Sequence, residues 1–131
     1  MRQELSERFL QLVQDARARV REVNPQELAA GPSLDSQPLH IVDIREESAW
    51  ASGHIAGAER IGRELLERDM RDRIELQNSH IVICSGSGLR SILVADVLTR
   101  MGFKRVASLA GGFNAWRAAG LPVVVDATRE R

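Results

Sequence analysis

The residue best suited to covalent chemistry is Cys84, the only cysteine in a chain of 131 residues. An apolar run, residues 80–83, precedes it, and residues 85–88 (Ser-Gly-Ser-Gly) follow it. Glycines let successive backbone N–H groups converge on one point, and such a nest binds an anion. Arg90 adds a positive charge, and a helix beginning near Ser91 directs its positive end at the same point. Both effects lower the pKa of a thiol, so the pattern predicts that Cys84 is a thiolate near neutral pH and acts as a nucleophile.

The segment around Cys84 also fits two other interpretations. A cysteine at the end of an apolar run is also typical of a buried structural residue. A loop that holds the phosphate of a cofactor is the weaker fit, because residues 84–91 lack the lysine of a P-loop and the GxGxxG spacing. A lone cysteine excludes an internal disulfide and a cysteine-rich zinc site.

The elements around Cys84 alternate between strands and helices. Strands are predicted at residues 39–44, 80–84, 104–109 and 121–125. Helical segments of roughly ten residues between strands favour parallel pairing with right-handed crossovers. We therefore predict an α/β fold with a central parallel sheet flanked by helices. Ligands of such sheets bind beyond the carboxyl ends of the strands, where Asp43 and Cys84 both fall.

The helices are predicted from apolar spacing and end signals. Residues 5–20 form an amphipathic helix that packs on its own domain or contacts a protein partner. Asn24, Pro25 and Glu27 indicate the start of a short helix that ends at Gly31. Further helices are expected at residues 46–52, 64–74, 91–101 and 113–119, and a loop at residues 33–38.

Length and composition bound the function. The chain is long enough for one domain, which we divide into an N-terminal helix extension (1–22), the α/β domain (23–126) and a tail (127–131). Eighteen basic and eighteen acidic residues balance, so bulk charge favours neither nucleic acid nor a membrane as partner. Without an apolar leader or a spanning run, we expect a cytoplasmic protein.

Four segments resemble, in order, the motifs of rhodanese domains: VDIREESAW, GHIAGA, CSGSGLRS and SLAGGFNAWRAAGLPV. The similarity runs from about Leu39 to Val124. It implies a rhodanese-like fold in three layers and a cysteine that takes sulfane sulfur from a donor and passes it to a nucleophilic acceptor. No metal or organic cofactor is implied.

The resemblance assigns roles residue by residue. Cys84 is similar to the persulfide-forming cysteine, and Asp43 and Arg45 match supporting residues of the pocket wall. His54, Phe113 and Trp116 match packing residues. The implied substrate-binding residues are Ser85, Gly86, Ser87, Gly88, Leu89, Arg90 and Ser91.

The loop departs from the family in one respect. Sulfurtransferases of this type place four residues between the cysteine and the arginine, whereas five separate Cys84 from Arg90. Five is the spacing of related phosphatases and arsenate reductases. From the four motifs together we still expect a sulfurtransferase that moves sulfur from thiosulfate or a persulfide to a thiol or cyanide through a Cys84 persulfide. A phosphatase or arsenate reductase, and a non-enzymatic rhodanese-like binding module, stay open as alternatives.

Overall fold

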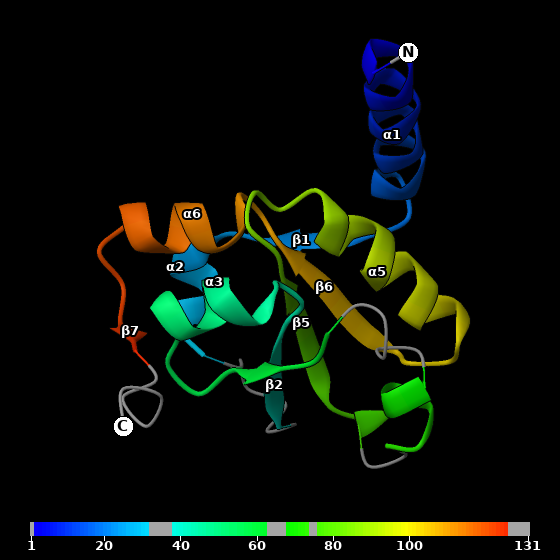
Figure 1. The fold of residues 1–131 in the computed structure, drawn as a ribbon. Coiled ribbons are helices and arrows are strands. Elements are labelled where there is room, and N and C mark those ends of the chain that lie inside the picture. The colour runs from blue at the N-terminus through cyan, green and yellow to red at the C-terminus, as the bar shows by residue number, and fades with distance from the viewer. Residues whose placement is uncertain (1, 32–37, 63–67, 74–75, 126–131) are drawn as a thin grey trace.

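The structure, a computed structural model, describes residues 2–31, 38–62, 68–73 and 76–125, with side chains from residue 6 onward. A five-stranded sheet with the order β1-β6-β5-β2-β4 forms its centre, and every pairing in it is parallel (Figure 1). The predicted α/β fold with a central parallel sheet is therefore confirmed. The strands of this sheet are β1 (Arg21–Val23), β2 (Leu39–Asp43), β4 (Glu59–Arg60), β5 (His80–Cys84) and β6 (Arg105–Leu109).

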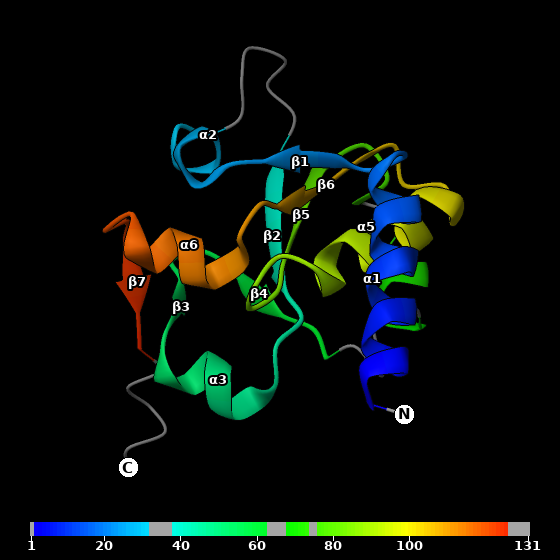
Figure 2. The same cartoon turned by 90° about the horizontal axis from the view of Figure 1, so that it is seen from above.

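Helices cover both faces of the sheet (Figure 2). The helices α1 and α5 lie on one side, and α2 and α6 lie on the other, with α3 near the carboxyl end of β2. The helices are α1 (Arg2–Arg17), α2 (Pro25–Ala29), α3 (Glu47–Ser52), α5 (Arg90–Arg100) and α6 (Gly112–Ala118). The predicted helix over residues 64–74 lies partly outside the described residues, of which 68–71 are helical.

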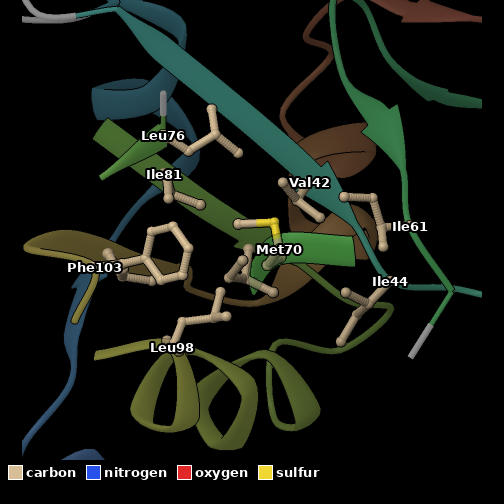
Figure 3. Close-up of a cluster of buried hydrophobic side chains, with 11 residues drawn as sticks. Val42, Ile44, Ile61, Met70, Leu76, Ile81, Leu98 and Phe103 are labelled. Carbon is tan, nitrogen blue, oxygen red and sulfur yellow. The ribbon is translucent and has the colours of Figure 1, made fainter. Parts of the chain in front are cut away.

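Alternating residues of β5 enter different cores, as the pleat of a strand requires. Ile81 and Ile83 face the α5 side, where Met70 lies between β2 and α5 (Figure 3). Val82 and Cys84 face the α2 and α6 side. This alternation decides where each side chain at the end of β5 points.

The strand predicted at residues 121–125 is shorter than expected and does not belong to the central sheet. Only Val123–Val124 form a strand, β7, and it pairs antiparallel with β3 (His54–Ile55) outside the central sheet. The indole Nε1 of Trp116 donates to the carbonyl of Pro122 over 2.9 Å and holds the chain against α6 on its way back. Both valines of β7 are exposed, so β7 is not a buried strand.

The N-terminal helix packs on its own domain. Val13 and Ala16 of α1 are 1% exposed and form a small core with Ile92 of α5. The helix spans Arg2–Arg17, three residues earlier than predicted at each end. The next element, β1, crosses the domain boundary predicted after residue 22 and pairs with β6. A protein partner for α1 stays a prediction.

The helix α2 begins with the predicted capping residues. The Asn24 side chain accepts a hydrogen bond from the Glu27 amide, and the Glu27 carboxylate accepts one from the Asn24 amide, each over 2.8 Å. Gly31 follows the helix with a φ of 83°. The predicted loop at 33–38 and the tail at 127–131 lie outside the described residues except for Pro38. Among the helices described, none has the length and apolar character needed to cross a membrane.

Candidate functional site

The candidate loop connects β5 to α5 at the carboxyl edge of the sheet. Residues 85–89 follow the last residue of β5, Cys84, and α5 begins at Arg90, one residue before the predicted start. Asp43 ends the neighbouring strand β2 and is the register partner of Cys84. The predicted strand–loop–helix unit is confirmed, and it places the loop where α/β sheets bind ligands.

The Cys84 side chain points into the core. Its exposed fraction is 0%, and it belongs to an apolar cluster with Leu28, Val82, Leu109 and Trp116. The nearest hydrogen-bond acceptor for the thiol is the Ser85 carbonyl, 3.6 Å away. The side chain therefore lies on the α2 and α6 face of the sheet and not over the loop.

The prediction of a Cys84 thiolate near neutral pH was wrong. Burial, followed by the charge of the Asp43 carboxylate, raises the pKa of the Cys84 thiol to about 12. The charge of Arg45 and a backbone N–H of Phe113 lower the pKa, but they do not compensate for burial. A thiolate is poorly stabilised in apolar surroundings, and the loop amides act on another side chain.

The side chain at the centre of the loop is that of Ser85. Its Oγ accepts hydrogen bonds from the amides of Gly88, over 3.1 Å, and Ser91, over 3.3 Å. Because successive side chains of an extended strand point to opposite faces, Ser85 turns toward α5 where Cys84 turns away from it. The nest predicted for the thiol is therefore built around a hydroxyl.

Ser85 is one end of a buried chain of three hydroxyl groups. Its Oγ donates to the Oγ of Ser91 over 3.0 Å, and Ser91 Oγ lies 2.7 Å from the Oγ of Ser108 in β6. The three residues are at most 4% exposed. Since a buried hydroxyl needs a partner, this chain fixes the rotamer of Ser85 and ties the loop to α5 and β6.

Two glycines allow the loop to pack against the turn that begins α6. The carbonyls of Ser85 and Gly86 accept hydrogen bonds from the amides of Phe113, over 2.8 Å, and Asn114, over 3.1 Å. Gly112 has a φ of 62°, and a Cβ there would lie 2.6 Å from the Gly86 carbonyl oxygen. Gly88 has a φ of 86°, and its Cβ would lie 2.6 Å from the Gly111 nitrogen. Side chains at either position would push the loop off α6.

Asp43 and Arg45 form an ion pair below the loop. The Arg45 Nε lies 3.1 Å from both Asp43 carboxylate oxygens, and its Nη2 lies 2.8 Å from Oδ2. Nη2 also donates to the Gly53 carbonyl over 2.7 Å, and the guanidinium lies 4.1 Å from the centre of the Phe113 ring. Such geometry satisfies both buried charges, as expected of supporting residues. Their place in a substrate pocket stays a prediction.

Arg90 does not turn toward the loop in this structure. Its guanidinium lies over the ring of Phe9 in α1, 5.4 Å from the ring centre, and the residue is exposed. A contact of this kind is stabilised by the ring's negative face. The loop therefore presents backbone amide dipoles, whereas the guanidinium of Arg90, which was predicted to add a positive charge to the loop, contacts the N-terminal helix.

Three residues of the family motifs have packing positions. His54 is 8% exposed, its ring stacks on Trp50 with the centres 3.4 Å apart, and its Nδ1 lies 2.9 Å from the Trp50 carbonyl oxygen. Phe113 and Trp116 are each 4% exposed and belong to the same apolar cluster as Cys84. Within the described part of the chain, no three His, Cys, Asp or Glu side chains gather in a way that would hold a metal ion.

Sequence analysis missed the central position of Ser85, although two signals pointed to it. Four residues, Gly86 to Leu89, separate Ser85 from Arg90, which is the spacing that the family resemblance gives from nucleophile to arginine. The alternation of β5 also places residues 81, 83 and 85 on one face. The apparent extra residue in the loop is thus counted from Cys84, which is the last residue of the strand.

Comparisons with known proteins agree with this fold. The sequence model of the family described as "Rhodanese-like domain" matches residues 24–119. The chain is 35% identical over 86 residues to thiosulfate sulfurtransferase GlpE of Pseudoalteromonas translucida, which covers 66% of this chain and 80% of the relative. It is 31% identical over 102 residues to thiosulfate sulfurtransferase GlpE of Actinobacillus pleuropneumoniae serotype 3, covering 78% of this chain and 91% of the relative.

Solved structures give the same result. A protein of unknown function from Rhodopseudomonas palustris, described as a possible tyrosine phosphatase, matches with a TM-score of 0.78 and 28% identity, over 88% of this chain and 93% of its own. A rhodanese-like domain protein from Staphylococcus aureus matches with a TM-score of 0.64 and 27% identity, over 74% of this chain and 91% of its own.

Proposed function

The chain belongs to the rhodanese-like domain family, and from that membership we propose that it is a rhodanese-like binding module whose loop carries a hydroxyl where a sulfur-carrying thiol would stand. The observation that supports this proposal is the position of the Ser85 Oγ, which accepts hydrogen bonds from the amides of Gly88 and Ser91. A serine hydroxyl forms no persulfide. The folded module therefore binds at its loop without transferring sulfur.

The ligand expected at this loop is a compact anion such as thiosulfate. For the amides of Gly86, Ser87 and Leu89 the structure gives no acceptor among the described residues. Backbone N–H groups in a glycine-rich loop at the start of a helix favour a negative charge. The Ser85 hydroxyl is a further donor once it turns away from Ser91.

Sulfur loading tests the proposal. The wild-type protein is incubated in its native state with thiosulfate or glutathione persulfide, and its intact mass is then measured under denaturing conditions, so that only covalently bound sulfur is counted. We expect an unchanged mass and no thiocyanate after addition of cyanide. A gain of one sulfur that the Cys84→Ser variant loses would overturn the proposal.

A sulfurtransferase that uses Cys84 is the second candidate. It is favoured by the relatives named thiosulfate sulfurtransferase, at 30–35% identity over 80–91% of their length, and by Cys84 being the only thiol of the chain. In this mechanism the thiolate attacks the sulfane sulfur of thiosulfate, a sulfur–sulfur bond forms, and sulfite leaves with the electron pair of the broken bond. Cyanide then attacks the outer sulfur, which yields thiocyanate and restores the thiolate.

This second mechanism requires the Cys84 thiol to leave its apolar cluster and to lose its proton. Burial opposes both steps, because it excludes the donor and raises the pKa of the thiol to about 12. The phosphatase and arsenate reductase alternatives carry the same requirement, since they also use Cys84 as the nucleophile. We therefore place the binding module first.

A further inference from the structure

A cavity of about 600 Å³ opens at the amino end of the sheet, opposite to the loop. His80 and Arg105, the first residues of β5 and β6, both line it, whereas the loop follows Cys84 at the other end of β5. Its volume lies within the range of pockets that bind small molecules, which is roughly 300–1,000 Å³. The cavity is therefore a site separate from the loop.

The cavity exists because β1 covers only part of β6. The register pairs Arg21 with Ala107 and Val23 with Leu109, so the pairing with β1 begins only at Ala107. Arg105 and Val106, the first two residues of β6, have no partner in β1. The first two residues of β6 thus line an open notch beside α2 and the end of α5.

Basic side chains dominate the charged lining. Arg19, Arg21, Lys104 and Arg105 line the cavity together with one acid, Glu27. The whole chain has a net charge of zero, so this excess of positive charge is local. The lining therefore favours an anion.

Two of these cations are held by protein groups and two are available. Arg19 Nη2 lies 2.8 Å from the Asp96 carboxylate, and Arg105 donates to the Asn78 carbonyl over 3.0 Å. For Arg21 and Lys104 the structure gives no acceptor within the described residues. Glu27 is occupied by the Asn24 amide. The pair Arg21 and Lys104 is thus free to bind a ligand's charge.

The rest of the lining is apolar. Leu28, Val82 and Ala107 are each at most 6% exposed and form part of the wall, with Val23 and Leu39 beside them. An inorganic ion gains nothing from such a wall, whereas an organic ligand removes apolar surface from water when it packs there. The occupant suited to both parts has a charged group and an apolar body.

We propose that this cavity binds a small organic phosphate, with the phosphate at Arg21 and Lys104 and the apolar body against Leu28, Val82 and Ala107. The guanidinium fork of an arginine matches phosphate oxygens, and a lysine adds a point charge. The proposal is independent of the function proposed for the loop, because no residue of residues 84–91 lines the cavity.

Phenyl phosphate is the probe for this site, and two-dimensional ¹H–¹⁵N NMR gives the readout. We expect saturable shifts of the amides of Arg21, Val82 and Ala107, with a dissociation constant of about 1 mM or below. Inorganic phosphate has only the charged group of the probe, and phenol has only its apolar ring. Each should bind at least about tenfold more weakly than phenyl phosphate, which is a loss of about 1.4 kcal/mol of binding free energy. The amides of Gly86 to Arg90 report separately on anion binding at the loop.

Charge-matched variants complete the test. The Arg21→Gln/Lys104→Gln variant should bind phenyl phosphate at least about tenfold more weakly, because hydrogen bonds between charged groups contribute about 1.5–3 kcal/mol each. The Arg71→Gln/Arg117→Gln variant loses the same charge away from the cavity and should bind within about twofold of wild type. Absence of saturable shifts at the cavity, or equal weakening in both variants, would overturn the proposal.

Discussion

The Ser85 hydroxyl lies 3.0 Å from the hydroxyl of Ser91, six residues further along the chain, at the point where the loop amides converge. This contact links the last turn before α5 to the first residues of that helix. It also separates two neighbouring side chains, because the thiol of Cys84 points to the opposite face of the sheet. The chemistry of the loop therefore depends on residue 85.

The Cys84 thiol should be unreactive in the folded protein. Its exposed fraction is 0% and its pKa is about 12, so a thiolate fraction of only about 10⁻⁴ is expected at pH 8. Iodoacetamide at pH 8 should alkylate the native protein at least about a hundredfold more slowly than the urea-unfolded protein. Equal rates in the two states would contradict the buried position.

Stability should fall at high pH because of the same thiol. The pKa is raised in the folded state from 9.0 to about 12, so the folded state favours the protonated form. This contribution is complete below pH 9 and is lost as pH rises from 9 toward 12. Urea unfolding at pH 8, 9 and 10 should show a decline that is smaller in the Cys84→Ala variant. An identical pH dependence in both proteins would be evidence against the shift.

The Asp43→Asn variant should be strongly destabilised. The change removes the negative charge of the partner and leaves the largely buried Arg45 guanidinium facing a neutral amide, and breaking a buried pair costs about 3–5 kcal/mol. Arg17→Gln is the control, because the side chains of its pair with Glu22 are 41% and 28% exposed and the pair should contribute less than about 1 kcal/mol. The free energy of unfolding in urea measures both. Similar losses in the two variants would refute a structural role for the Asp43–Arg45 pair.

Gly112→Ala should disturb the loop, and Gly120→Ala should not. Both glycines have a positive φ, of 62° and 73°, so backbone strain of about 1 kcal/mol is common to the two variants. Only at Gly112 would the added Cβ meet the Gly86 carbonyl oxygen, at 2.6 Å. We expect an additional loss of about 1–3 kcal/mol and shifted amide resonances at Gly86 and Gly88. Equal effects of both substitutions would show that the close approach is not important.

The sequence predicted most of the frame of this protein. The strands at 39–43, 80–84 and 105–109 and the helix after the loop were identified from apolar runs and glycine positions, and the parallel sheet followed from their alternation. Burial explains this success, because a strand covered on both faces is apolar throughout. The same property leaves the direction of each side chain unspecified, since an apolar run does not mark which face of the sheet a residue such as Cys84 occupies.

The candidate site was harder to predict for two physical reasons. Successive side chains of a strand point to opposite faces of the sheet. Choosing Cys84 rather than Ser85 as the central residue therefore selects a side chain in the core instead of one in the loop. The partner of Arg90 is also non-local, because Phe9 lies in a helix about eighty residues earlier in the chain. Residues whose contacts are local were predicted well, as the capping pair Asn24 and Glu27 illustrates.

The Ser85→Cys variant tests the central claim most directly, because it places a thiol where the loop amides converge. Wild type, Ser85→Cys, and Ser85→Cys with Cys84→Ala are each incubated with thiosulfate, and intact mass and thiocyanate formation are measured. We predict that both proteins with a cysteine at position 85 gain one sulfur atom and convert cyanide to thiocyanate, and that wild type does neither. Sulfur loading of wild type on Cys84, with no gain in the Ser85→Cys variants, would contradict the claim that residue 85 is the centre of the site.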